Sequence, residues 1–289
     1  MQVSEQIHAL RIPFKIPIAP GKQIDRVVYS YVISGDELTL IDSGVSGAER
    51  IIYDCIKKIG RDPSDISMLI LSHSHPDHLG SAKAIKEATG CMILAHRGER
   101  RWIEDTELQF EERPVPGFHG LVGGPVVVDR LLSDGETLHI AHNIDFRVIH
   151  TPGHSSGSIS LCCESQKIIF SGDAIPLPND LPIYEDIGDC VRSIARLRQC
   201  EEIGTLLSSW ETPVLGRQEI ERRVDAGLYY LRRVHDSVLR AENEGIQDPT
   251  DLCRHVIGAL GLPPFAANPL AARAFASSLE EANRVIFDK

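Results

Sequence analysis

The chain has 289 residues, and its hydrophobic content of 42% and charged content of 25% are typical of a globular protein and exclude general disorder. A formal net charge of −11 argues against a broad nucleic-acid-binding surface, so a nucleic-acid partner is not expected. The longest apolar runs, such as Ile66–Leu71, are too short to cross a bilayer, and the N-terminus shows no secretory signal pattern. We therefore expect no membrane association and a cytoplasmic location.

Up to about Pro213, short runs rich in β-branched residues alternate with helical stretches, and Gly or Pro residues mark turns between them. The predicted strands are Ile7–Arg11, Val27–Ile33, Glu37–Ile41, Met68–Leu71, Met92–Ala95, Asp145–Ile149, Ile159–Cys163, Lys167–Phe170 and Thr205–Leu207. The predicted helices are Gly47–Ile59, Leu79–Thr89, Gly98–Glu111 and Asp189–Glu201. The stretch Arg113–Pro125 is rich in Pro and Gly, and we expect a long loop there that forms a wall of a pocket.

The pattern changes to helices alone beyond Gly216. Apolar residues recur near a 3.6-residue period over Gln218–Ala241, which predicts a long amphipathic helix. Asp248 or Thr250 can cap a following helix, and Asn268 can cap a last one. We therefore expect a catalytic domain over residues 1–215 and a helical extension over residues 216–289. This extension is a candidate cover for the pocket or a candidate homodimer interface.

Four residues with metal-binding side chains follow the apolar run that ends at Leu71. They are His73, His75, Asp77 and His78, in the order His-x-His-x-Asp-His. Side chains alternate in extended backbone, so the first two histidines can point toward one ion, whereas Asp77 and His78 are displaced toward a second. Imidazole nitrogen and carboxylate oxygen together suit zinc, or iron or manganese where oxygen ligands are more numerous. A solvated turn that happens to be rich in histidine is the alternative.

Two further segments repeat the arrangement of an apolar strand followed by a turn with a potential ligand. His154 ends Thr-Pro-Gly-His, and Asp173 ends Ser-Gly-Asp. Each by itself is equally consistent with an ordinary polar turn. Both follow strands of what we expect to be one sheet system, so these residues can meet the His73–His78 segment at one rim.

The order of these three motifs resembles the metallo-β-lactamase-fold hydrolase superfamily. Further similarity lies at Leu40-Ile-Asp-Ser-Gly and at Ser133-Asp-Gly-Glu-Thr-Leu, and the resemblance extends from about Tyr29 to Thr212. It implies an α/β fold, an αββα metallo-β-lactamase sandwich, here with a C-terminal all-helical extension. It also implies one or two Zn²⁺ ions, with His73, His75 and His154 on the first, Asp77 and His78 on the second, and Asp173 bridging. Asp42 is interpreted as orienting a ligand.

The sequence departs from the superfamily pattern at Trp210. The superfamily commonly supplies a last histidine after a late strand, and Trp210 stands at that place. Indole has no lone pair for a metal, so Glu211 or water is the candidate replacement. The loss of one ligand predicts a weakly occupied second site, or one that prefers iron or manganese.

The function that these residues favour is hydrolysis by a metal-bound hydroxide. A metal lowers the pKa of bound water from about 15.7 to about 7, and Asp77 is the candidate group that orients this nucleophile and carries its proton. The acidic charge and the compact loops favour a small acyl substrate, a thioester, ester or lactone. Glyoxalase II-like thioesterases of the superfamily also carry C-terminal helices, which supports the same hypothesis.

Two other functions remain open. An endoribonuclease or phosphodiesterase of the same fold requires a basic groove, for which Arg97, Arg100 and Arg101 are candidates. A metal-binding protein with lost or weak turnover is favoured by Trp210. His119, in the Pro- and Gly-rich loop, is a candidate substrate contact.

Overall fold

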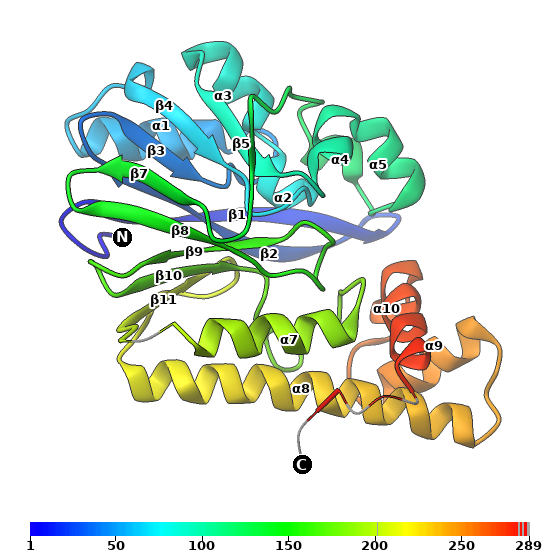
Figure 1. Ribbon diagram of the computed structural model, residues 1–289. Coiled ribbons are helices and arrows are strands. Elements are labelled where there is room, and N and C mark those ends of the chain that lie inside the picture. Colours follow the sequence, from blue (N-terminus) through cyan, green and yellow to red (C-terminus); the bar gives the residue numbers. More distant parts are fainter. Residues whose placement is uncertain (201, 283, 285, 288–289) are drawn as a thin grey trace.

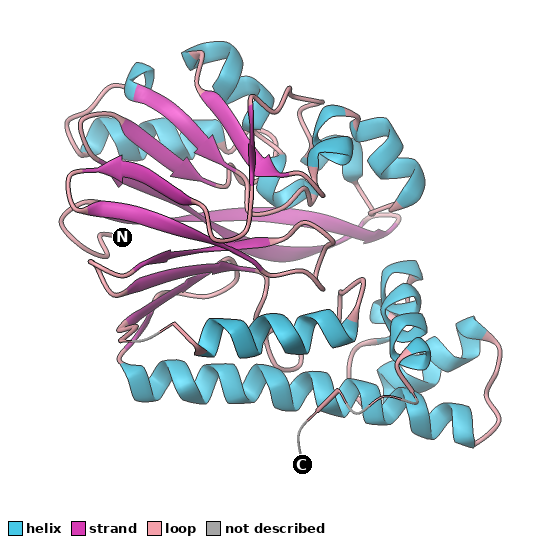
Figure 2. Ribbon diagram, viewed as in Figure 1, coloured by secondary structure: helices cyan, strands magenta, loops and turns pink. Residues whose placement is uncertain are grey.

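The computed structural model describes residues 1–200, 202–282, 284 and 286–287. In these ranges the chain forms two six-stranded sheets that pack face to face, with helices on both outer faces (Figures 1 and 2). The first sheet has the order β1 (Ile7–Ala19), β2 (Lys22–Ser34), β3 (Leu38–Ile41), β4 (Ile66–Ile70), β5 (Met92–His96), β6 (Arg130–Leu132). The second has the order β12 (Val214–Leu215), β11 (Thr205–Ser208), β10 (Ile168–Gly172), β9 (Ile159–Cys163), β8 (Ile144–His150), β7 (Thr137–Ala141). This is the expected αββα sandwich.

The first sheet changes from antiparallel to parallel along its width. Strands β1 to β3 pair antiparallel, and β3 to β6 pair parallel. Parallel neighbours need crossovers, which α1 (Glu49–Lys58) and α3 (Ala82–Thr89) provide on the outer face. Both faces of β3 and β4 are covered by these helices and by the second sheet, so their residues are apolar in near-continuous runs.

The second sheet is antiparallel except where β10 pairs parallel with β11. The connection between these two strands carries α7 (Ile187–Arg198), which covers the outer face of the sheet together with α8 (Arg217–Asn243) (Figure 1). Between the sheets, the rings of Phe146 and Phe170 pack edge to face with centroids 5.3 Å apart. This inner core fixes the sheet edges at which the site lies.

The C-terminal helices pack against the second sheet layer and share its apolar core. They are α8, α9 (Pro249–Ala259) and α10 (Pro269–Glu280), and side chains of all three belong to one buried cluster with those of α7. Asp248 caps α9 and Asn268 caps α10. The Ser277 hydroxyl on α10 accepts a hydrogen bond from the Ile187 N–H at 2.9 Å, which joins the last helix to the start of α7.

Several boundaries differ from the sequence-based prediction. β1 continues to Ala19 and forms a long hairpin with β2, because its residues beyond Arg11 pair with residues 22–28. Strands β6, β7 and β12 were not predicted. The predicted helix Gly98–Glu111 is divided into α4 (Arg100–Glu104) and α5 (Thr106–Glu112), because Asp105 takes an extended conformation and its carboxylate caps α5.

Two further boundaries also differ. The predicted helix Leu79–Thr89 is divided into α2 (Pro76–Leu79) and α3, and the predicted loop at 113–125 contains α6 (Phe118–Leu121). Glu201, the last residue of the predicted helix Asp189–Glu201, lies outside the described residues. Within the described ranges, none of the helices is long and apolar enough to span a membrane.

Candidate metal centre

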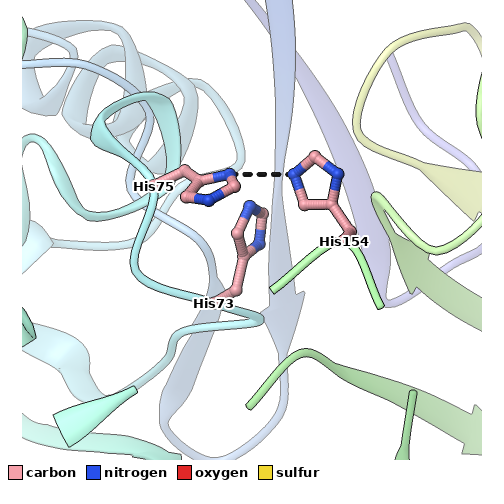
Figure 3. Close-up of side chains that lie close together, drawn as sticks. All are labelled: His73, His75 and His154. Atoms are coloured by element: carbon pink, nitrogen blue, oxygen red, sulfur yellow. Dashed lines mark hydrogen bonds between the residues drawn. The ribbon is translucent and has the colours of Figure 1, made fainter. Parts of the chain in front are cut away.

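Three chain segments meet at one edge of the sandwich. The segment after β4 carries His73 and His75, the β8–β9 turn carries His154, and the end of β10 carries Asp173. Figure 3 shows the imidazole rings of the three histidines facing one another. Gly153 allows the β8–β9 turn, since it has a φ of 122° and a Cβ there would lie 2.3 Å from the Cys190 nitrogen. The rim predicted from the sequence is therefore formed.

The ligand atoms lie close enough to share bound ions. Nε2 of His154 is 2.8 Å from Nδ1 of His75 and 3.2 Å from Oδ2 of Asp173. The same Oδ2 atom of Asp173 is 3.8 Å from Nε2 of His73. The other carboxylate oxygen, Oδ1, is 3.5 Å from Nε2 of His78. The atoms form two groups of metal-binding size, His73–His75–His154 and His73–His78–Asp173.

The donor atoms of this cluster are buried without partners. Nε2 of His73, His75 and His78 and both carboxylate oxygens of Asp173 have no hydrogen-bond partner among the described residues. Buried polar atoms are nearly always satisfied, because leaving one unpaired costs about 1–3 kcal/mol. Bound divalent metal ions would give partners to Nε2 of His73 and His78 and to the carboxylate of Asp173, and imidazole with carboxylate is a donor set that transition metals prefer. The residues therefore fit a metal.

Contacts to the other ring nitrogens hold three of the histidines in the orientation that a ligand needs. Nδ1 of His78 lies 2.8 Å from Asp42, Nδ1 of His73 lies 3.0 Å from the Ser72 hydroxyl, and Nδ1 of His154 lies 2.9 Å from the Ile183 carbonyl. Each contact directs the Nε2 lone pair of its ring into the cluster. Asp42 is thus placed as predicted, behind a ligand rather than in the cluster.

Burial and mutual charge set the protonation of the cluster. Burial lowers the pKa of His73, His75 and His154, so these rings are neutral and can donate a lone pair. Burial also acts to lower the pKa of His78, but the carboxylates of Asp173 and Asp42 outweigh it and raise this pKa well above its ordinary value. Burial acts to raise the pKa of Asp173, but the charge of His78 outweighs it, so this pKa is lowered.

Asp77 lies at the margin of the cluster rather than inside it. Its Oδ2 is 3.9 Å from Nε2 of His78, and it belongs to neither of the two groups of metal-binding size. Burial raises the pKa of Asp77, and the charge of Asp173 adds to this effect. The carboxyl group also lines the adjoining pocket, where it can exchange a proton with a bound molecule.

The family of the chain follows from comparison with known proteins. A family model described as the metallo-beta-lactamase superfamily matches residues 24–211, about two thirds of the chain. The chain belongs to this superfamily. The expected fold and the expectation of a metal-dependent hydrolase are thereby confirmed.

Curated relatives in the superfamily match parts of the chain. It is 28% identical over 161 residues to "Probable metallo-hydrolase YqgX" of Bacillus subtilis, covering 56% of the chain and 70% of that protein. It is 31% identical over 149 residues to "Acyl-coenzyme A thioesterase MBLAC2" of Gallus gallus, covering 47% of the chain and 52% of that protein. The chain thus spans about half the length of the thioesterase.

A solved structure shares the fold along nearly the whole chain. The metallo-beta-lactamase family protein TTHA1429 from Thermus thermophilus superposes with a TM-score of 0.75 at 21% identity. The superposition covers 98% of this chain and 95% of that protein, so it includes the C-terminal helices. The likeness concerns the fold alone.

A buried glutamate that the sequence analysis did not identify joins two of the ligand segments. Glu99 is 1% exposed and accepts hydrogen bonds from the N–H and hydroxyl of Ser74, from the Ser155 hydroxyl at 2.7 Å and from the Gly157 N–H at 2.6 Å. Ser74 lies between two of the histidines, and Ser155 follows His154. A Cβ at Gly157 would lie 2.8 Å from Glu99, so only glycine allows this approach. No local motif marks a residue of this kind.

Trp210 lies beside the cluster where the superfamily pattern predicts a histidine. Its ring centroid is 6.4 Å from that of His78, and the guanidinium carbon of Arg26 lies 4.8 Å from the indole centroid. Glu211, the candidate replacement ligand, instead forms an ion pair with Arg223 on α8. Its side chain is therefore directed to the helical layer, which disfavours it as a metal ligand.

A pocket of about 330 Å³ opens from the cluster. His75, Asp77, His154 and Asp173 line its polar end, and most of its other walls are apolar. They come from the β1–β2 hairpin, the 113–125 loop, the segment after β10 and the C-terminal helices, and include Phe14, Ile24, Val115, Leu121, Leu177, Leu181, Phe265 and Leu270. The loop is thus a pocket wall, as predicted, and the helical extension supplies part of another.

His119 does not contribute to this pocket, contrary to the sequence-based interpretation. Its side chain is 59% exposed, and Nδ1 faces the carboxylate of Glu107 at 3.6 Å. The ring also packs on Phe110, with centroids 4.7 Å apart. It lies on α6, whose buried residues Phe118 and Leu121 fix the helix with this side chain outward.

Proposed function

We propose that this chain hydrolyses a small acyl compound, a thioester, ester or lactone, with zinc held by the cluster. The observation that carries the proposal is the apolar pocket that ends on His75, Asp77, His154 and Asp173. An apolar cavity of this size accepts a short acyl chain and delivers its carbonyl to the polar end. The relative named as an acyl-coenzyme A thioesterase supports the same substrate class.

In this proposal His73, His75 and His154 hold one ion, and His78 and Asp173 hold a second with the help of Asp77. A bound divalent metal supplies a hydroxide nucleophile at neutral pH and neutralises charge on the carbonyl oxygen. Asp77 orients the attacking water and accepts its proton, a role that its position between cluster and pocket and its raised pKa support. The apolar walls exclude bulk water from the reacting carbonyl.

A nucleic-acid substrate finds less support. Arg100 pairs with Glu104 at 2.8 Å and Arg101 with Glu112 at 2.7 Å, while Arg97 contacts the Ser133 hydroxyl at 3.5 Å. The charges that a basic groove requires are thus neutralised by nearby acids or directed away from the pocket. The alternative of a metal-binding protein with lost or weak turnover is favoured by one observation, that Trp210 stands where the superfamily pattern has a histidine. The cytoplasmic location and a homodimer through the C-terminal helices stay predictions.

The test compares zinc-loaded protein on an acyl-coenzyme A thioester, a p-nitrophenyl ester, a lactone and bis(p-nitrophenyl) phosphate. We expect turnover of the acyl compounds, loss of turnover with a chelator, and recovery when zinc is returned. His154→Ala should abolish it, whereas His139→Ala, at an exposed histidine paired with Asp145, should not. Cleavage of the phosphodiester alone, or bound zinc with no turnover, would contradict the proposal.

A further inference from the structure

Arg113 places a buried guanidinium in the wall of the pocket. It follows α5 directly, and its N–H donates to the Gln109 carbonyl at 2.7 Å, so its backbone is fixed by the end of the helix. The residue is only 5% exposed and lines the same cavity as His75, Asp77 and His154. Its charge is close enough to lower the pKa of His75. A guanidinium group therefore lies beside the reactive end of the cavity.

This guanidinium lacks the partner that buried arginines normally have. None of the described residues forms an ion pair or a side-chain hydrogen bond with it. Arg26, which lines the same pocket, makes two hydrogen bonds to Asp180 at 2.8 and 2.7 Å, so its charge is already neutralised. A buried charge without a partner is costly, and proteins keep such groups mainly where a ligand completes them.

The neighbouring charged groups leave Arg113 cationic at neutral pH. Burial lowers its pKa to about 10, against the opposing effect of the Asp77 and Glu185 carboxylates. Glu99 also favours the charged form, and Arg273 on α10 opposes it. Glu99 is already bound to Ser74, Ser155 and Gly157, and Asp77 faces His78. The fork of donors on Arg113 is thus available to an oxyanion in the pocket.

We propose that Arg113 binds a carboxylate of the substrate, so that the acyl compounds hydrolysed here carry a free carboxylate near the scissile carbonyl. This inference rests on the proposed acyl hydrolysis and specifies its substrate class. A carboxylate carries one negative charge, which the single guanidinium balances, and its two oxygens match the planar fork. A phosphate monoester carries about −1.5 to −2 at neutral pH and would need further donors. The apolar walls then hold the hydrocarbon part of the substrate.

The kinetic test uses two substrates that differ only in this charge, mono-p-nitrophenyl glutarate and its neutral methyl ester. In zinc-loaded protein, Arg113→Met should lower kcat/KM for the monoester by at least about 30-fold, mainly through KM, and leave the neutral diester within about threefold. Arg113→Lys should restore part of the loss. Arg130→Met, at an exposed arginine paired with Glu136, is the matched control and should change neither substrate. Equal losses on both substrates would overturn the proposal, since they would assign Arg113 to the reacting carbonyl or to the fold.

A binding test separates this inference from the proposed reaction. Octanoate, octanamide and octyl phosphate are titrated calorimetrically into zinc-loaded wild type and Arg113→Met, after the zinc content and melting temperature of both have been shown to agree. Octanoate should bind the wild type at least about tenfold more tightly than the variant, and octanamide should bind both equally. If neither ester is hydrolysed, the proposed function fails, but this difference still supports the carboxylate site. Equal octanoate affinities, or tighter binding of octyl phosphate than of octanoate to the wild type, would overturn it.

Discussion

The carboxylate of Asp42 lies 2.8 Å from Nδ1 of His78 and leaves Nε2 of the same ring facing Asp173 at 3.5 Å. Asp42 also accepts hydrogen bonds from the N–H and the hydroxyl of Ser72, at 2.7 and 2.8 Å. The end of β3 is thereby tied to the segment that carries the ligands. An outer carboxylate of this kind fixes the tautomer of a ligand and increases its basicity.

Replacement of Asp42 by asparagine should therefore weaken metal binding on the His78 side of the cluster. We expect a loss of about 10- to 100-fold in affinity for the weaker zinc ion, measured by competition with a chromophoric chelator. Asparagine tolerates the positive φ of 57° at this position, so the fold should persist. Asp54→Asn, at an exposed position of α1, is the control, and equal zinc affinities in the two variants would refute this role for Asp42.

Trp210→His should strengthen the second zinc site. The indole ring is the neighbour of His78 at the place where the superfamily pattern has a histidine, so an imidazole there would add a donor. The gain in zinc affinity should be at least about tenfold, because the loss of a residue that only hydrogen-bonds to a metal ligand already changes metal affinity by about that factor. Trp210→Phe keeps an aromatic ring without a lone pair and should show no gain. A gain of the same size in both variants would indicate relief of crowding instead.

Glu99→Gln should destabilise the protein, because the amide presents an N–H group to donors that need an acceptor. Four donors from Ser74, Ser155 and Gly157 converge on this carboxylate. We expect the free energy of unfolding in urea to fall by about 2–4 kcal/mol. Glu87→Gln, on the exposed side of α3, should change it by less than about 0.5 kcal/mol. A Glu99→Gln variant as stable as this control would show that the network contributes little.

His96 should make the stability depend on pH. Burial, together with the neighbouring His150 and Arg97, lowers its pKa from 6.5 to about 4, and its Nδ1 accepts a hydrogen bond from the Gly98 N–H at 3.2 Å. Between these pH values the unfolded chain binds more protons than the folded one, so the free energy of unfolding falls as the pH decreases from about 6.5 to about 4.

The measurement is urea unfolding at pH 7 and pH 4 in wild type and His96→Asn, whose amide oxygen can still accept from Gly98. Wild type should lose about 2 kcal/mol more than the variant over this interval. His142→Asn, at an exposed histidine, should behave as wild type. An identical pH dependence in wild type and His96→Asn would show that His96 titrates alike in the folded and unfolded chain.

The sequence was informative where chemistry and local pattern coincide. The ligands follow apolar strands in short motifs, so the residues that meet at the rim could be named, and Asp42 was correctly interpreted as a supporting residue. The 3.6-residue period of apolar residues likewise predicted α8. The candidate caps Asp248 and Asn268 are observed at the starts of α9 and α10.

The residues that the sequence did not reveal act through long-range contacts. Glu99 and Arg113 stand in ordinary helical surroundings, and their roles depend on segments more than twenty residues away, such as Ser155 and His154. Strands β6 and β7 also depend on long-range or tertiary context, because they are short edge strands whose local sequence patterns are weak. Glu211 was a plausible ligand from its position in the sequence alone. Its ion pair with Arg223 became visible only once the structure placed α8 beside it.

The zinc content of the purified protein, measured by mass spectrometry beside acyl turnover, tests whether the cluster holds a catalytic metal. We expect at least one zinc ion per wild-type chain, and neither zinc nor turnover in the double variant His73→Ala with His154→Ala. The exposed pair His139→Ala with His142→Ala should match the wild type. A wild-type protein that takes up no transition metal, or a His73/His154 double variant that keeps its metal and its turnover, would show that these histidines do not form a catalytic metal site.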